Sequence, residues 1–149
     1  MIVEFSIITD AATLAIFDLK ALRHRMSDAF DWWSIQKDEL FEMNEGNVAF
    51  LNLGSDGKYQ VKVVEDLPGV SAGVYLRSPS GEFFVGAGED TTGGDLEPDG
   101  SDAIQGRSIK LNAGNYLLKF YRSGDVISLA FLPSEMSSNE LVESVRLND

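Results

Sequence analysis

The stretch Val48-Ala-Phe-Leu-Asn-Leu-Gly-Ser-Asp-Gly-Lys-Tyr-Gln-Val-Lys-Val-Val64 decides the fold class of this chain. From Lys58 onward, polar and apolar side chains alternate, which is typical of a strand with one wet face and one buried face. Gly54-Ser55-Asp56-Gly57 suits a hairpin loop, because these residue types accept turn conformations. We therefore predict a hairpin that pairs residues 48–53 with residues 58–64.

The same pattern continues on both sides of this stretch. Alternation and turn residues predict further strands at residues 2–9, 13–19, 73–77, 82–87, 107–111, 116–122 and 125–132. The turns Thr9–Ala12, Ser78–Gly81 and Ser123-Gly124 would close three more hairpins. The long helical segments that link parallel strands are missing. We predict one mostly β domain over residues 1–149, an antiparallel β-sandwich or jelly-roll-like fold with one or two short helices, a barrel being the alternative.

Two segments carry helix signals. Ser34–Met43 is the better helix candidate of the region between the first strands and residue 48. Near the C-terminus, Ser137–Glu140 fits a capping box ahead of an apolar run, which favours a helix. An edge strand over Leu141–Leu147 is the alternative for this tail.

The charge balance restricts the partners. The 149 residues hold 24 acidic and 12 basic side chains, a formal net charge of −12. Nucleic-acid binding needs Lys and Arg to displace counterions, and anionic lipids repel acidic surfaces, so we expect neither nucleic acid nor a membrane as partner. A basic protein would be attracted instead. The alternative is that the charge serves solubility alone.

The residue inventory excludes several kinds of chemistry. There is no cysteine, which excludes disulfides, thiolate nucleophiles and cysteine-ligated metal sites. No dinucleotide or phosphate-loop glycine motif occurs, and serine nucleophile motifs are missing. The start lacks the basic residues of a secretory signal, and no apolar run reaches the ~20 residues of a membrane span, so we expect a cytoplasmic protein.

An acidic segment follows the strand at 82–87. It carries six carboxylates and no basic residue, at Glu89, Asp90, Asp95, Glu97, Asp99 and Asp102. The order Asp95-Leu-Glu97-Pro-Asp99-Gly resembles the first half of an EF-hand loop, and calcium takes 6–8 oxygen ligands. Gly106 stands where the closing Glu would be, so calcium at Asp95, Glu97, Asp99 and Asp102 is the weaker hypothesis. A solvated loop held open by self-repulsion is favoured, and no other cofactor is expected.

Two further clusters have both a structural and a functional interpretation. Lys20, Arg23, His24 and Arg25 form the main basic cluster, for which internal pairing around Asp28, Asp31, Asp38 and Glu39 is favoured over an anion site. In Trp32-Trp33, adjacent side chains on a regular element cannot both point inward, so at least one should be partly exposed. An exposed Trp could anchor a protein partner or a sugar. The alternative is that both cap the sandwich, with their N–H groups bonded to backbone.

The segment Arg107-Ser-Ile-Lys-Leu-Asn-Ala-Gly-Asn-Tyr-Leu-Leu-Lys-Phe-Tyr-Arg122 resembles a module of small acidic bacterial β-sandwich proteins. The competence protein J type, which inhibits a DNA-entry nuclease, and toxin-immunity proteins share this character. The resemblance implies a protein-binding role and transfers no catalytic residue.

These observations favour a non-enzymatic inhibitor or immunity-type protein whose acidic surface binds a basic partner. The expected partner-binding residues are Trp32, Trp33, Glu89, Asp90, Asp95, Glu97, Asp99 and Asp102. A calcium- or carbohydrate-binding β-sandwich is the first alternative. An enzyme that uses only carboxylates is the second.

Overall fold

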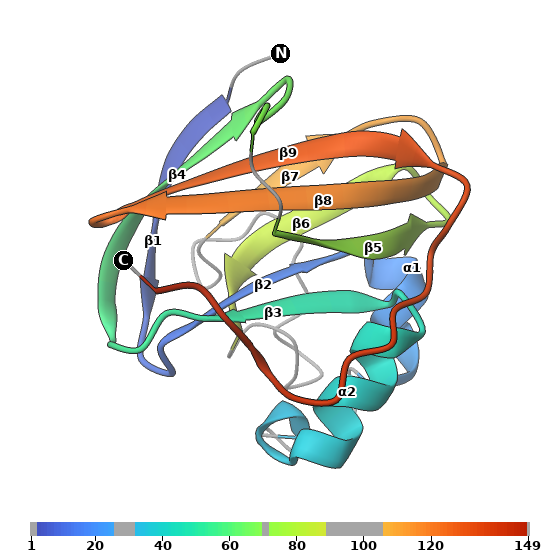
Figure 1. Ribbon diagram of the computed structural model, residues 1–149, viewed down its shortest axis with the longest axis horizontal. Helices are drawn as coiled ribbons and strands as arrows, with labels where there is room; N and C mark the ends of the chain where they lie inside the picture. Colours follow the sequence, from blue (N-terminus) through green and yellow to red (C-terminus); the bar gives the residue numbers. More distant parts are fainter. Residues whose placement is uncertain (1–2, 26–31, 70–71, 89–105, 149) are drawn as a thin grey trace.

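Two five-stranded sheets face each other, and helices cover the outer face of one of them (Figure 1). The computed structural model describes residues 3–25, 32–69, 72–88 and 106–148. The first sheet has the order β1 (Val3–Thr9), β4 (Gly57–Val64), β9 (Val126–Ser134), β8 (Gly114–Ser123) and β5 (Gly73–Ser78). The second has the order β10 (Val145–Arg146), β3 (Val48–Asn52), β2 (Thr13–Phe17), β6 (Glu82–Ala87) and β7 (Gly106–Lys110). The helical segments are α1 (Leu19–Leu22), η1 (Arg23–Arg25), η2 (Trp32–Ser34) and α2 (Gln36–Asn44).

The predicted mostly β sandwich is confirmed, although both sheets are mixed. Most neighbouring strands pair antiparallel, but β4 pairs parallel with β9, and β10 pairs parallel with β3. The helix expected within 34–43 is also confirmed, as α2.

One of the four predicted hairpins is confirmed, and three are wrong. Strands β8 and β9 pair as expected, with Ser123 opposite Val126, so the turn is Gly124-Asp125, one residue later than predicted. The loops after β1, β3 and β5 instead carry the chain across to the opposite sheet. A hairpin and a crossing both bury the same alternate side chains against one core, so alternation alone does not distinguish them.

The core between the sheets is built from those alternate side chains. Ile7 and Val61 come from the first sheet, and Leu14, Ile16 and Leu51 from the second, all with at most a trace of exposed surface. Strand β2 is buried along its whole length, because its other face, with Ala15 and Phe17, belongs to a second apolar cluster beneath the helices. The second sheet is therefore the middle layer of three (Figure 1).

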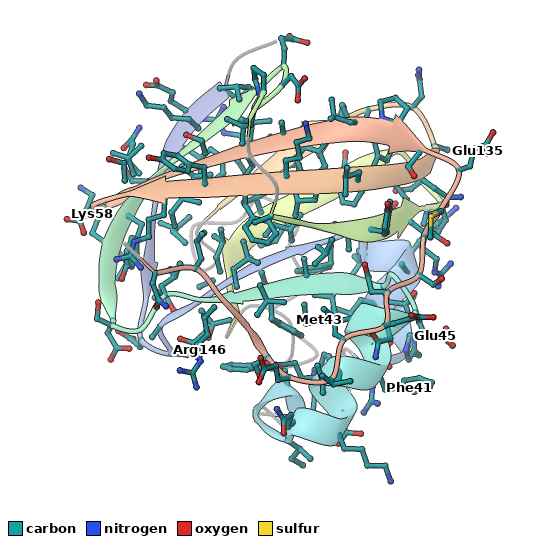
Figure 2. All side chains as sticks on the ribbon, in the orientation of Figure 1. Phe41, Met43, Glu45, Lys58, Glu135 and Arg146 are labelled. Carbon is teal, nitrogen blue, oxygen red and sulfur yellow. The ribbon has the colours of Figure 1, made fainter. Side chains whose placement is uncertain are left out.

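Helix α2 supports this second cluster with one of its faces. Met43 is fully buried against the second sheet, whereas Phe41 projects into solvent (Figure 2). The helix ends at Asn44, and two residues later Gly46 has a left-handed φ of +75° and an N–H that donates to the Met43 carbonyl. A Cβ at Gly46 would lie 1.8 Å from the Ser137 carbonyl oxygen, so only glycine fits where the C-terminal tail crosses the helix end.

The helix predicted for the C-terminal tail is wrong, and the alternative edge strand is present in shortened form as β10. The backbone of the tail bonds to other segments instead of to itself. Asn139 N–H donates to the Asn44 carbonyl, Leu141 N–H donates to the Asn44 side chain, and Leu147 N–H donates to the Asn52 carbonyl. These tertiary bonds use the backbone groups that a helix would need.

Candidate functional site

The chain leaves the second sheet at β6, before the acidic segment, and re-enters it at the neighbouring strand β7. Gly86 of β6 lies opposite Gly106 of β7, so the chain departs and returns side by side. The predicted site residues Glu89, Asp90, Asp95, Glu97, Asp99 and Asp102 lie outside the described residues. The calcium and partner-binding assignments to them therefore stay predictions. Among the described residues, no group of three His, Cys, Asp or Glu side chains could hold a metal ion.

The two tryptophans do not form an exposed anchor, and the expectation that at least one is partly exposed is wrong. Trp32 is 4% exposed and Trp33 is 9% exposed. Both pack on Phe50 of β3 with ring centroids 5.7 Å apart, Trp32 edge-on and Trp33 stacked. The 3₁₀ turn η2, which comes just before α2 in the chain, brings both rings into the second apolar cluster. Neither indole N–H has a hydrogen-bond partner in the described part of the chain.

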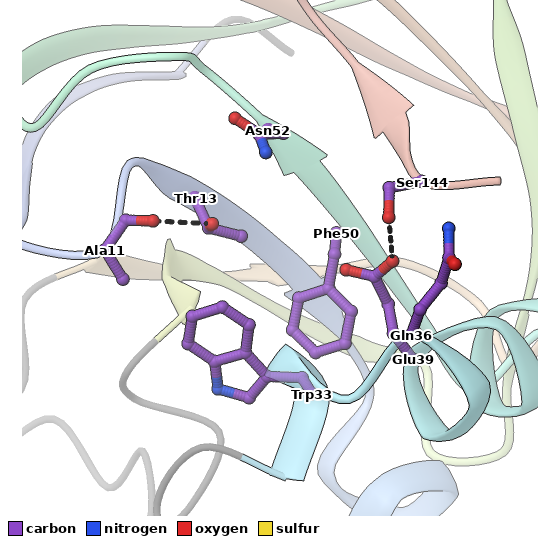
Figure 3. A pocket seen from close by; sticks show the side chains of 8 residues that line it. All are labelled: Ala11, Thr13, Trp33, Gln36, Glu39, Phe50, Asn52 and Ser144. Atoms are coloured by element: carbon purple, nitrogen blue, oxygen red, sulfur yellow. Dashed lines mark hydrogen bonds between the residues drawn. The ribbon is translucent and has the colours of Figure 1, made fainter.

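Trp33 also lines a small polar pocket of about 200 Å³, near the start of β2 and the end of β3. The pocket brings together segments far apart in sequence: the β1–β2 loop, β2, η2, α2, β3 and the residues before β10. Its described lining is Ala11, Thr13, Trp33, Gln36, Glu39, Phe50, Asn52 and Ser144. Figure 3 shows the Trp33 and Phe50 rings side by side, with the Glu39 carboxylate beside Phe50 and Ser144 above it.

Glu39 is the one carboxylate among these described lining residues. Its Oε1 accepts a 2.6 Å hydrogen bond from the Ser144 hydroxyl. Burial raises the pKa of Glu39, and the Ser144 bond offsets part of that effect. No ion pair within the described ranges includes Glu39, although internal pairing with the basic cluster was expected for it. The carboxylate therefore faces the pocket without a cation.

The basic cluster pairs with another acid of α2, which the sequence did not single out. Glu42 is 1% exposed and accepts hydrogen bonds from His24 (2.9 Å), Arg25 (2.8 Å) and Asn47 (2.7 Å). Burial acts to raise the pKa of Glu42, but the bonds from Arg25, Asn47 and His24 outweigh it and hold the pKa below that of an ordinary glutamate. Arg25 also reaches Asp38 at 3.3 Å, as predicted. Asp28 and Asp31 lie outside the described residues.

The pocket adjoins the point where the acidic segment begins. A Cβ built on Gly88, the last described residue before the segment, would lie 3.0 Å from Thr13 and 3.5 Å from Trp33. Thr13 and Trp33 both line the pocket. The described end of β6 thus connects the pocket directly to the most acidic part of the sequence.

Comparison with known proteins places the chain. A family model described as a family of unknown function (DUF6386) matches residues 1–147. The chain belongs to this family. A search of curated protein sequences finds no significant match.

Two solved structures are similar to this member of the family. One, described as crocagin biosynthetic gene J, has a TM-score of 0.57 at 11% identity and covers 90% of this chain and 97% of its own. The other is ComJ from Bacillus subtilis, described as an inhibitor of the DNA degrading activity of NucA. It has a TM-score of 0.53 at 12% identity, with 90% and 99% covered. The resemblance expected from residues 107–122 is confirmed at the level of the fold.

No helix among the described residues is long and apolar enough to cross a membrane.

Proposed function

We propose that this protein is a non-enzymatic inhibitor of the immunity type that binds a basic protein, with a nuclease as the partner that fits best. The observation that carries the proposal is the likeness to ComJ, an inhibitor of a nuclease's DNA degrading activity, over 90% of this chain. The family description and the two similar structures indicate no catalytic activity.

Electrostatics gives the physical reason for such a partner. A nuclease must be basic where it holds DNA, so an acidic inhibitor can occupy the same surface. Half of the formal net charge of −12 comes from the six carboxylates between Glu89 and Asp102, where no basic residue stands. A concentrated field of one sign raises the association rate with a partner of opposite sign.

The described lining of the pocket also favours binding over catalysis. Acid–base chemistry by carboxylates alone normally uses two facing groups, about 5–9 Å apart in glycosidases. The described lining supplies Glu39 and no second acid. Its aromatic rings and polar amides suit recognition of a side chain.

The test is a DNA-degradation assay with a basic nuclease or toxin encoded beside the gene for this chain. The ComJ–NucA pair serves as the positive control. We expect stoichiometric inhibition at ~50 mM salt that weakens steeply towards ~500 mM, because salt screens charge–charge attraction. Inhibition that ignores salt would contradict the acidic-surface mechanism. Absence of both binding and inhibition would contradict the function.

A further inference from the structure

The pocket beside Trp33 holds a carboxylate whose charge the described chain does not balance. Glu39 is half-buried, and its one hydrogen bond within the described part of the chain comes from the neutral Ser144 hydroxyl. The nearest acidic neighbour on the helix, Asp38, is occupied with Arg25, and the buried Glu42 with Arg25 and His24. The three carboxylates of α2 therefore have different roles, and Glu39 is the one left facing open space.

The walls of this pocket have the chemistry of a cation site. Trp33 lines the pocket with a ring that is 9% exposed, and the negative face of an indole attracts ammonium and guanidinium groups. Phe50, which is 2% exposed and packs on both tryptophans, holds that ring in place. Gln36 adds an amide oxygen, which can accept hydrogen bonds from the same groups, whereas the Asn52 amide oxygen already accepts from the Gly54 N–H at 2.9 Å. A volume of about 200 Å³ admits the end of one long side chain and is too small for a folded element.

We propose that this pocket receives a lysine or arginine side chain of the protein partner, with Glu39 as its counter-ion. The inference rests on the proposed function, because that function supplies the basic protein whose side chain enters the pocket. The cation would lie beside the Glu39 carboxylate, in the pocket that Trp33 also lines (Figure 3). It would supply the positive charge that no described residue places beside the Glu39 carboxylate.

The pocket's position suits this role. Gly88, the last described residue before the acidic segment, lies against Thr13 and Trp33, so the pocket adjoins the point where the chain leaves for that segment. The acidic segment would attract the partner over a distance, and the pocket would fix its orientation by accepting one side chain. Long-range charge acts mainly on association, whereas a desolvated ion pair acts mainly on dissociation.

The first experiment uses small probes and needs no partner. N-acetyl-lysine methylamide and N-acetyl-arginine methylamide are titrated into the full chain, with N-acetyl-norleucine methylamide as the uncharged control. Emission of the two tryptophans and amide shifts report binding. We expect saturable binding of the cationic probes alone. Equal binding of the norleucine probe, or binding of glucose in place of the cations, would overturn the inference.

Matched variants locate the effect. Glu39→Gln keeps the acceptor for Ser144 and should weaken the cationic probes about tenfold. Glu143→Gln makes the same change of charge on an exposed side chain next to Ser144 and should leave them unchanged. Gln36→Lys places a cation one helical turn from Glu39 and should block the pocket from within. Equal affinities for wild type, Glu39→Gln and Gln36→Lys would overturn the inference.

The same variants separate this inference from the proposed function. If the partner binds wild type, Glu39→Gln should weaken that complex about tenfold and Glu143→Gln should not. A partner complex that ignores Glu39→Gln would contradict the pocket's role and leave the inhibitor function standing. Cationic probes that bind a protein without inhibitory activity would contradict the function and leave the pocket's chemistry standing.

Discussion

The Asn139 side chain lies against the outer edge of β5 and pairs with the backbone of Tyr75 as a neighbouring strand would. Its carbonyl oxygen accepts from the Tyr75 N–H at 2.8 Å, and its amide donates to the Tyr75 carbonyl at 2.9 Å. The same amide donates to the Met43 carbonyl at 2.8 Å. One side chain thus joins the edge of the first sheet to the end of α2.

Replacing this side chain should destabilise the whole domain. Asn139→Ala leaves the edge groups of Tyr75 without their partner and removes one of the bonds to the Met43 carbonyl, which still accepts from the Gly46 N–H. The loss should cost about 2–4 kcal/mol. Urea denaturation monitored by tryptophan emission measures the change. Asn112→Ala, at an exposed asparagine whose side chain makes no hydrogen bond to another described residue, should change stability by less than about 0.5 kcal/mol. Equal stabilities of the two variants would show that Asn139 does not hold the tail.

The buried Glu42 should make the fold sensitive to acid. Its pKa is lowered in the folded state, so its contribution is complete at neutral pH and is lost as the pH falls through the folded pKa, below the ordinary value of 4.5. Glu42→Gln should cost about 3 kcal/mol at pH 7, because it removes the buried negative charge that pairs with Arg25 and turns one acceptor oxygen into an amide donor that faces other donors. The difference from wild type should shrink as the pH approaches 3. Glu45→Gln, exposed at the end of the same helix, is the control, and a difference independent of pH would contradict this assignment.

Glu39 should show the opposite pH dependence. Its pKa is raised by burial, so the folded state holds the proton more tightly, and stability falls as the pH rises from 4.5 through the folded pKa. Glu39→Gln should therefore be more stable than wild type at pH 7, by less than about 1 kcal/mol because water still reaches the carboxyl. Thermal melts between pH 4 and pH 7 measure it. A variant less stable than wild type at pH 7 would contradict the raised pKa.

The position of the acidic charge, and not its amount, should decide partner binding. Neutralising Glu89, Asp90, Asp95, Glu97, Asp99 and Asp102 as amides changes the formal charge from −12 to −6. The matched control makes the same change at exposed acids elsewhere: Asp56, Glu82, Asp125, Glu135, Glu140 and Glu143. We expect the first variant to lose most of the affinity and salt dependence, and the second to keep most of both. Equal losses would mean that net charge alone acts.

Calcium should have no specific effect if these carboxylates serve a protein partner. Thermal melts with millimolar calcium should match those with millimolar magnesium, since both ions screen charge to the same extent. A bound ion would stabilise the folded state by mass action. A melting temperature raised by calcium alone, and lost in Asp95→Asn, would favour the calcium-binding alternative.

The strands were predictable from sequence because each one is a local pattern, but their partners were not. The alternation from Lys58 to Val63 places β4 correctly, yet Gly54–Gly57 turns the chain into the other sheet. One unused signal was Thr13–Phe17, where apolar residues run continuously. A strand buried on both faces needs a third layer, and the helical layer is present.

The candidate site was harder to predict, because the pocket joins segments from Ala11 to Ser144. No motif marks Glu39, which looks like any solvated acid of a helix until Ser144 and Phe50 are placed beside it. Both rings of Trp32-Trp33 are buried, because the 3₁₀ turn allows what a regular strand or helix forbids. Their role in partner binding stays a prediction. Glu42 was missed because burial of an acid cannot be read from its neighbours in sequence.

The direct pairing of Gly86 with Gly106 has a consequence for the chain between them. Because β6 and β7 already pair at these two residues, a short turn could close the same ladder without altering any other connection of the two sheets. The length of chain between Gly88 and Gly106 is therefore not fixed by the sandwich itself.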